Sequence, residues 1–181
     1  RRRRADDPVA RLAAELLASK KDRAENTMIV DVLRNDLGRV CAPGSVSVPR
    51  LWRLERTPSV QHLVSTVAGR LAPGRDAFDM LAAAFPGGSI TGAPKIRAME
   101  IIAEIEQAPR GVYCGAIGYL GFNGHADLNI AIRTAQFCNG VARLQGGGGI
   151  TARSNPAAEA FSNSAARCSG GRVELALRTP K

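Results

Sequence analysis

The chain has 181 residues, of which 45% are apolar and 23% charged, with a net charge of +9. These proportions are typical of a globular domain and exclude a disordered tail or a collagen-like fibre. The arginines are scattered and only 4% of residues are aromatic, which argues against a nucleic-acid surface. Apolar runs such as residues 82–85 are too short to cross a membrane, and no secretory signal pattern opens the chain. We therefore expect a cytoplasmic protein without nucleic-acid or membrane partners.

The first third of the chain predicts two helices followed by β structure. Asp7 and Pro8 are typical of a helix start, because an aspartate N-cap often precedes proline at the first helical position. Apolar residues then recur at helical spacing to about Lys21, which predicts one helix over that stretch. We further expect a second helix that stops at Gly38, short β-like runs over residues 41–59, and a strand over residues 60–67.

The remainder predicts helices mixed with antiparallel-looking strands. Asn123 and Gly124 are typical of a hairpin turn, and Pro94 is expected to start a strong helix. The other expected elements are a helix over residues 76–85, a tight loop over 86–92, strands over 112–120, 126–137 and 141–145, and a short helix from about Pro156. This mixture predicts the α+β class rather than a doubly wound sheet.

The four cysteines are far apart in the sequence and include no Cys-x-x-Cys pair. Their spacing favours neither zinc binding nor a disulfide framework. Buried free thiols in a reducing compartment are the simpler interpretation. They are Cys41, Cys114, Cys138 and Cys168.

Two acidic residues and one histidine are candidates for chemistry. Asp22 and Glu25 are three residues apart in a helical context, so both carboxylates share one helix face. That arrangement suits a hard cation and equally suits a charged helix surface. His62 lies among apolar residues of its strand, which by itself favours a packed, hydrogen-bonded side chain over an acid or base.

Arg133 is well placed to hold a carboxylate. The alternation of residues 126–133 predicts Ala126, Leu128, Ile130 and Ile132 toward a core and Asp127, Asn129, Ala131 and Arg133 toward a polar space. An arginine on a rigid strand suits bidentate carboxylate binding. By itself, the pattern favours the alternatives, which are a solvated strand face or an ion pair between Arg133 and Asp127.

Two glycine-containing segments suit an anion. Residues 146–149 are all glycine and follow a predicted strand, so their backbone N–H groups are open to a ligand, although a turn explains one or two glycines equally well. Residues 86–95 read PGGSITGAPK and fail the phosphate-loop pattern, because Ala93 and Pro94 follow Gly92. That segment remains an anion-friendly junction between a loop and a helix.

Together these segments resemble the chorismate-binding enzymes, which include anthranilate synthases, aminodeoxychorismate synthases, and isochorismate or salicylate synthases. The resemblance spans about residues 22–154, in order and at family spacing. It rests on residues 25–31 (ENTMIVD), 34–36 (RND), 62–65 (HLVS), 86–95, 118–119 (GY) and 132–133 (IR). It implies part of an α/β sandwich with mainly antiparallel sheets and flanking helices.

Within the family, the 86–95 loop and residues 60–66 (VQHLVST) are more similar to the aminodeoxychorismate synthases. Anthranilate synthases tend to have Pro-x-Gly-Thr-x-Ser-Gly-Ala-Pro-Lys in that loop. The similarity implies amination of chorismate to 4-amino-4-deoxychorismate in para-aminobenzoate and folate biosynthesis, with ammonia from a glutamine amidotransferase partner. The alternatives are an anthranilate synthase of tryptophan biosynthesis and a non-catalytic remnant that binds an amidotransferase.

The resemblance also implies a role for individual residues. Mg²⁺ would bridge a substrate carboxylate to Asp22, Glu25 and Glu159, and His62 would act near the departing hydroxyl. A metal with cationic and backbone donors would neutralise the chorismate dianion. Tyr113 and Arg133 match the residues that hold the enolpyruvyl carboxylate, Ser89 matches the loop hydroxyl, and Gly149 matches a backbone donor. The full substrate-binding set is Ser89, Thr91, Tyr113, Arg133, Gly147 and Gly149.

Two departures from the family pattern bear on activity. Aminodeoxychorismate synthases carry a Pro-Ile-Lys-Gly-Thr loop with a nucleophilic lysine, which we expect just before Arg1. The family's last helix reads roughly Glu-x-x-Glu-Thr-x-x-Lys, whereas Ser162, Asn163 and Ala166 follow Glu159 here, and Arg153 replaces a usual Asp. We expect residues 1–159 to be the carboxy-terminal part of a catalytic domain and residues 160–181 a divergent tail. Without the lysine, we expect this chain to be inactive alone.

Overall fold

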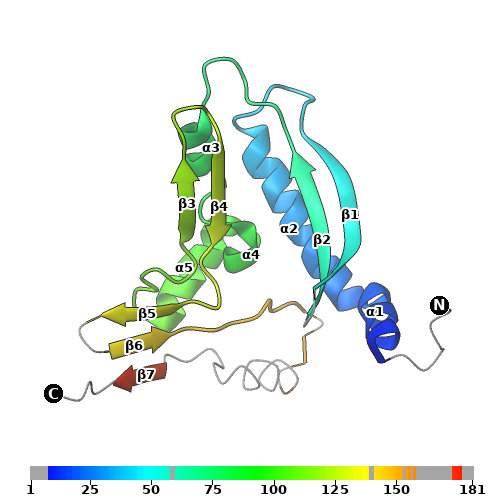
Figure 1. Ribbon diagram of the computed structural model, residues 1–181, viewed down its shortest axis with the longest axis vertical. Coiled ribbons are helices and arrows are strands. Elements are labelled where there is room, and N and C mark those ends of the chain that lie inside the picture. The colour runs from blue at the N-terminus through cyan, green and yellow to red at the C-terminus, as the bar shows by residue number, and fades with distance from the viewer. Residues whose placement is uncertain are drawn as a thin grey trace. The chain divides into compact units, whose positions relative to one another are not determined.

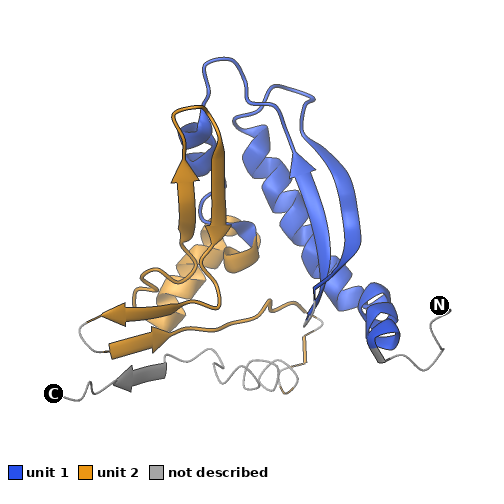
Figure 2. Ribbon diagram, viewed as in Figure 1, with its two compact units in different colours: residues 1–88 blue, residues 89–181 orange. Residues whose placement is uncertain are grey.

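The computed structural model describes residues 8–57, 60–138, 141–152, 154–155 and 157, and the backbone of residues 173–176. It divides into two compact units, residues 1–88 and 89–181 (Figure 2). Every strand pairing is antiparallel, as the sequence predicts. In chain order the elements are α1 (Pro8–Ala18), α2 (Lys20–Gly38), β1 (Ser47–Arg56), β2 (Gln61–Ala68), α3 (Ala77–Ala84), α4 (Gly88–Thr91), α5 (Lys95–Glu106), β3 (Ala116–Leu120), β4 (Ala126–Ile130), β5 (Ala135–Cys138), β6 (Val141–Leu144) and β7 (Val173–Ala176) (Figure 1).

The helix expected to reach Lys21 ends earlier, at Ala18. Ser19 has extended backbone angles (φ −63°, ψ 112°), and its side chain accepts a hydrogen bond from the Asp22 N–H at 3.2 Å. The serine hydroxyl thereby satisfies a backbone donor that would otherwise lack a partner at a helix N-terminus. The apolar residues that predicted the first helix therefore all lie in α1. Lys20 and Lys21 begin the second helix, which ends at Gly38 as predicted.

In unit 1, the long helix α2 packs against the β1–β2 hairpin (Figure 1). The predicted strand over residues 60–67 corresponds to β2, which pairs with β1 so that Glu55 lies opposite His62. The pairing slips near Trp52, whose φ of 54° lies in the left-handed region. Such a bulge bends one strand and redirects its side chains.

The helix expected over residues 76–85 is α3, and its start is fixed by a capping box. The Asp76 carboxylate accepts from the N–H groups of Phe78 and Asp79, while the Asp79 carboxylate accepts from the Asp76 N–H. These bonds satisfy the free donors of the first turn. The small core beside α3 consists of Val40, Cys41 and Ala83, with Leu37, Val46 and Leu71 around them.

From residue 86 onward, two boundaries differ from the sequence expectation. The expected tight loop over 86–92 contains the single helical turn α4. The strand expected from residue 112 begins at Ala116 instead, because Gly111 (φ 66°) and Cys114 (φ 65°) shape a turn. The hairpin between β3 and β4 confirms the turn predicted around Gly124, which has a φ of 80°.

The single strand expected over residues 126–137 is wrong, because β4 and β5 are separated by residues 131–134. Ala131 turns inward, donating to the Gly115 carbonyl and accepting from the Cys114 N–H, both at 2.9 Å. Its exposed fraction is 1%, whereas Ile130 and Ile132 are 37% and 47% exposed. The predicted alternation therefore fails at this point, where the chain leaves the β3–β4 ladder.

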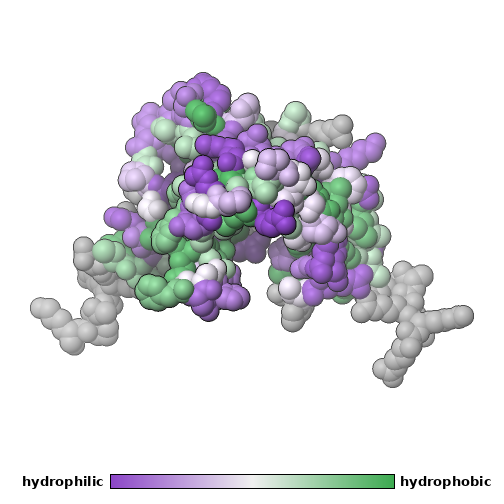
Figure 3. Space-filling model, turned by 90° about the horizontal axis from the view of Figure 1, so that it is seen from above, coloured by the Kyte–Doolittle hydropathy of each residue, from purple (hydrophilic) through white to green (hydrophobic). Residues whose placement is uncertain are grey.

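Among the described residues, the buried apolar side chains are no larger than valine. Apolar residues also reach the surface, shown green in Figure 3, and they include Phe78, Ile96 and Ile105 at 65–75% exposure. Burial of large apolar side chains is the dominant stabilising contribution in most domains. We therefore expect specific hydrogen bonds to contribute a larger share of the stability of the described part of this chain.

The cysteine prediction is confirmed in part. Cys41 and Cys114 are buried free thiols, but Cys138 is an exposed free thiol on β5, and Cys168 lies outside the described residues. The helix expected from Pro156 also lies largely outside them. No helix in the described part of the chain is long and apolar enough to span a membrane.

Candidate functional site

In unit 1, the predicted metal-binding residues Asp22 and Glu25 lie in the first two turns of α2, and both are half-buried. A carboxylate in the first turn is favoured by the helix dipole, which explains Asp22 without any ligand. The third predicted carboxylate, Glu159, lies outside the described residues. Among the residues that the structure does describe, no three His, Cys, Asp or Glu side chains gather closely enough to hold a metal ion.

The strand that carries His62 is held against α2 by Asn26. The Asn26 side-chain amide donates to the Leu63 carbonyl at 3.1 Å, and its oxygen accepts from the Ser65 hydroxyl at 2.5 Å. Ser65 also accepts from the Trp52 N–H at 3.0 Å, so β1 joins the same network. We call these bonds the Asn26 network. It connects the 25–31 and 62–65 motifs and fixes the backbone next to the half-buried His62.

In unit 2, the predicted loop residues Ser89 and Thr91 lie on α4, where Ser89 is exposed and Thr91 half-buried. Between them, the Ile90 carbonyl accepts a hydrogen bond from the Arg110 guanidinium at 3.2 Å. A side chain from the segment after α5 is thus attached to the loop that carries both hydroxyls.

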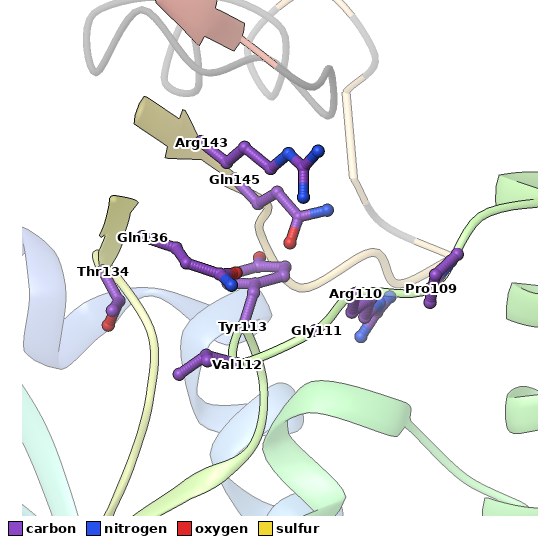
Figure 4. Close-up of a pocket in the computed structure, with 9 residues that line it drawn as sticks. All are labelled: Pro109, Arg110, Gly111, Val112, Tyr113, Thr134, Gln136, Arg143 and Gln145. Carbon is purple, nitrogen blue, oxygen red and sulfur yellow. The ribbon is translucent and has the colours of Figure 1, made fainter. Parts of the chain in front are cut away.

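Tyr113 and Gly147, two of the predicted substrate-binding residues, lie together in unit 2. A methyl group added at Gly147 would lie 3.1 Å from the Tyr113 hydroxyl oxygen, so the glycine leaves room for the phenol. The ring of Tyr113 lies beside the side chains of Gln136 and Gln145 (Figure 4). It borders a cavity of about 110 Å³ lined by Pro109, Arg110, Gly111, Val112, Tyr113, Thr134, Gln136, Arg143 and Gln145.

Arg110, which also lines this cavity, has several partners among the described residues. It forms a two-bond ion pair with Glu106, at 2.8 Å from Nε and 2.6 Å from Nη2. Nη1 donates to Cys114 Sγ at 3.2 Å as well as to Ile90, and the guanidinium carbon lies 5.7 Å from the centre of the Tyr113 ring. We call Arg110 and these partners the Arg110 cluster.

The cluster changes the acidity of its members. Burial raises the pKa of the Tyr113 phenol and that of the Cys114 thiol, and the positive charge of Arg110 opposes both effects. The hydrogen bond from Arg110 lowers the pKa of the Glu106 carboxyl, and Glu106 in turn raises the pKa of Arg110. At neutral pH, the ion pair is therefore charged, whereas Tyr113 and Cys114 are protonated.

The structure corrects the environment expected for Arg133. Arg133 does not lie on a rigid strand but in the bend between β4 and β5, with a φ of 52° and an exposed side chain. The alternative ion pair with Asp127 is not formed between these two described residues. Gly149 lies in the irregular segment after β6 and is half-buried.

Comparison with known proteins identifies the family. The family model described as chorismate binding enzyme matches residues 1–161. The chain belongs to the chorismate-binding enzymes. This member is 58% identical over 149 residues to anthranilate synthase component 1 of Streptomyces coelicolor, covering 82% of the chain and 29% of that protein. It is 56% identical over 158 residues to aminodeoxychorismate synthase component 1 of Salmonella typhimurium, covering 86% of the chain and 35% of that protein.

A solved structure supports the fold of this chorismate-binding enzyme. A Bacillus anthracis protein assigned as a 2,3-dihydroxybenzoate-specific isochorismate synthase matches with a TM-score of 0.76 and 31% identity, covering 90% of this chain and 44% of that one. The predicted fold class is confirmed by this match. The chain spans about a third of the length of the curated relatives, from 29% to 35%.

Sequence reasoning missed Arg110 and the structural role of Asn26. Arg110 is one of many isolated arginines in the sequence, and its partners Glu106, Ile90 and Cys114 lie 4, 20 and 4 residues away. The Glu106–Arg110 spacing at the end of a predicted helix was the available signal, because residues four apart can pair. Asn26 belongs to a motif, but nothing in its position indicates a bond to a strand.

Proposed function

We propose that this chain contributes the chorismate-contacting part of an aminodeoxychorismate synthase, which replaces the ring hydroxyl of chorismate with an amino group. The observation that carries the proposal is the placement of the Tyr113 hydroxyl beside Gly147 in unit 2. A phenolic donor beside a residue of the 146–149 glycine run suits a carboxylate oxygen, since hydrogen bonds to an anion are stronger than neutral ones. Chorismate carries two carboxylates, and the enolpyruvyl carboxylate is the one we assign to Tyr113.

The other predicted residues keep their proposed roles. Arg133 would add positive charge for the same carboxylate, and Ser89, Thr91 and Gly149 would donate hydrogen bonds. His62 would act near the departing hydroxyl, from a strand whose backbone Asn26 fixes at Leu63.

Mg²⁺ is the cofactor that the family implies. When bound, it would neutralise substrate carboxylate charge as a Lewis acid. Asp22 and Glu25 offer the oxygen donors that Mg²⁺ prefers. These two residues form part of a ligand set at most, because Glu159 lies outside the described residues. The proposed steps at Tyr113 and Gly147 do not depend on the metal.

The choice of product rests on the loop that carries α4. Its Ser89-Ile90-Thr91 sequence supports the aminodeoxychorismate synthase assignment. The second candidate is an anthranilate synthase, favoured by 58% identity to the Streptomyces protein. Both are named component 1, which supports a partner component, and we propose a glutamine amidotransferase that supplies ammonia.

The first experiment measures chorismate binding. Calorimetric titration of the 181-residue chain with chorismate, with and without Mg²⁺, should show saturable binding. Tyr113→Phe should weaken the affinity by about 10- to 100-fold, because it removes a hydrogen bond to a charged group. Tyr119→Phe is the matched control, since Tyr119 is 60% exposed on β3, and it should bind like the parent. Equal affinity of both variants would contradict the assignment of Tyr113, and absence of binding by the parent would favour a non-catalytic remnant.

The second experiment identifies the product. The 181 residues contain no Pro-Ile-Lys-Gly-Thr run, so we expect no turnover of chorismate by this chain with ammonium and Mg²⁺. Addition of the amino-terminal part of the Salmonella relative as a separate chain should restore product formation. An aminated chorismate that retains its enolpyruvyl group supports the first candidate. Anthranilate with an equal amount of pyruvate supports the second.

A further inference from the structure

Arg110 stands out among the described residues because one side chain contacts four residues in three segments of unit 2. It binds both carboxylate oxygens of Glu106 at the end of α5, the Ile90 carbonyl of α4 and the Cys114 thiol, and it lies over the Tyr113 ring. Only a planar guanidinium presents donors in several fixed directions at once. The exposed fraction of its side chain is 23%, so these bonds form in a partly dehydrated environment.

These contacts connect two sets of predicted substrate-binding residues. Ile90 lies between Ser89 and Thr91, so a hydrogen bond to its carbonyl restrains the backbone that carries both hydroxyls. Tyr113 is the phenol beside Gly147. Because α4 is a single turn of four residues, too short to hold its own conformation, its position depends on contacts such as the packing of Gly88 near Val32 and the bond from Arg110 to Ile90. The ion pair with Glu106 in turn fixes the orientation of the guanidinium, because both carboxylate oxygens are used.

We propose that Arg110 is a positioning residue, which holds the α4 loop and Tyr113 in a fixed relation so that both can contact one ligand in unit 2. The inference rests on the proposed function, which assigns the ligand as chorismate. Arg110 itself contacts no substrate in this proposal, because four of the five N–H donors of its guanidinium bond to Glu106, Ile90 and Cys114. Its role differs from that of Arg133, which is exposed.

The test uses the full 181-residue chain with three substitutions and a control. Arg110→Ala removes both charge and geometry. Arg110→Lys keeps the charge but cannot reach Glu106, Ile90 and Cys114 together. Glu106→Gln keeps a hydrogen-bonding side chain but loses the ion pair. Arg97→Ala is the matched control, because Arg97 is an arginine on α5 that pairs with glutamates at 56% side-chain exposure.

Two readouts separate geometry from charge without any ligand. Hydrogen exchange of the peptide covering residues 86–95 reports the α4 loop. Its rate should rise about fivefold in Arg110→Ala, the factor expected for loss of one hydrogen bond, and equally in Arg110→Lys. The pH profile of Cys114 alkylation, followed by peptide mass spectrometry with Cys41 as internal reference, reports the charge. Its midpoint should move to higher pH in Arg110→Ala and stay near the parent value in Arg110→Lys, with Glu106 and Tyr113 as the other ionisable groups beside the thiol.

The outcomes are distinct. Faster loop exchange in both Arg110 variants, with an alkylation midpoint shifted only in Arg110→Ala, supports a positioning role. Smaller increases in loop exchange are expected for Glu106→Gln and none for Arg97→Ala. Unchanged loop exchange in Arg110→Ala, or full rescue of loop protection by lysine, would overturn the inference. An equal rise in exchange across peptides of both units would show general destabilisation, which also overturns it.

Chorismate binding then connects the inference to the proposed function. Arg110→Ala and Arg110→Lys should each weaken chorismate binding about tenfold, with Arg97→Ala unchanged. If the parent chain binds no chorismate, the proposed function fails, whereas the loop and thiol readouts still decide the role of Arg110. If the parent binds and both Arg110 variants bind equally well, the positioning role is wrong while the proposed function stands.

Discussion

The Asn26 network in unit 1 and the Arg110 cluster in unit 2 have the same structural role but are built from different chemical groups. Each attaches a segment with predicted functional residues to a neighbouring element. The Asn26 network uses neutral amide, hydroxyl and backbone groups, whereas the Arg110 cluster is built around an ion pair. Neutral hydrogen bonds do not titrate between pH 3 and 9, but a carboxylate does. The comparison therefore predicts that the two regions respond differently to substitution and to acid.

The largest effect is expected in the neutral network. Asn26→Ala removes the donor to the Leu63 carbonyl and the acceptor of the Ser65 hydroxyl, leaving two part-buried groups without their partner. We expect the free energy of unfolding to fall by about 2–3 kcal/mol, measured by urea denaturation. Asn35→Ala is the control, because Asn35 is exposed on the same helix. If the two substitutions cost the same, the Asn26 network is not a structural element of unit 1.

The next effect tests whether unit 1 depends on close packing as well as hydrogen bonds. A methyl group at Gly88 would lie 2.6 Å from Val32 Cγ1 on α2, so Gly88→Ala should destabilise the chain by about 1–3 kcal/mol. The double variant Gly88→Ala with Val32→Ala should recover part of the loss by making room. Gly38→Ala is the matched glycine control, since no atom lies within 4 Å of the added methyl. Equal melting temperatures for Gly88→Ala and Gly38→Ala would contradict the packing argument.

Acidification should separate the two regions. The hydrogen bond from Arg110 holds the pKa of Glu106 below its ordinary value of 4.5, so the carboxylate stabilises the folded state above that value. This contribution is lost as the pH falls below 4.5 through the lowered pKa. Hydrogen exchange should therefore accelerate in the 86–95 peptide over that range while the 61–68 peptide, held by the Asn26 network, changes less.

Glu106→Gln is the control for the acid effect, because it removes the titrating group and keeps the side-chain length. Below pH 4.5, hydrogen exchange in the 86–95 peptide of this variant should accelerate less than in the parent chain, because residue 106 can no longer be protonated. A parent chain and a Glu106→Gln chain with the same acid response would show that another carboxylate is responsible. The pKa of the Asp79 carboxyl is also lowered. Asp79 lies on α3 in unit 1, so its protonation should affect exchange in α3 equally in the parent and in Glu106→Gln.

The local signals in the sequence predicted elements well where a single residue type decides the backbone. Pro94 precedes α5, Gly38 ends α2, and Gly124 shapes the β3–β4 turn. Prediction failed where a contact distant in sequence overrides the pattern. Residues 126–137 form two strands because Ala131 bonds to the backbone of Cys114 and Gly115. Nothing in a local alternation of apolar and polar residues indicates that partner.

In the candidate site, too, some residues could be predicted from the sequence and others depend on contacts distant in sequence. Motif resemblance selected Tyr113 and Gly147, which the structure places side by side, because a motif carries information about tertiary neighbours that periodicity lacks. It selected Arg133 with the wrong backbone environment, since strand propensity says nothing about a φ of 52°. Arg110 was missed because its importance comes from four partners in three segments. An isolated arginine in a sequence is more often a solvated surface residue.

The smallest effect is expected at such a solvated arginine and completes the comparison within unit 2. Arg97 contacts Glu100 at 2.8 Å and Glu104 at 3.2 Å, with 56% of its side chain exposed, against 23% for Arg110. Solvent screens an exposed pair and both long side chains lose rotamer freedom, so such pairs contribute between 0 and about 1 kcal/mol. Arg97→Ala should therefore lower the free energy of unfolding by less than about 0.5 kcal/mol in urea denaturation at low salt, and by less still at 1 M salt. A cost for Arg97→Ala equal to that of Arg110→Ala would mean that burial and the contacts to Ile90 and Cys114 add nothing to an arginine–glutamate pair.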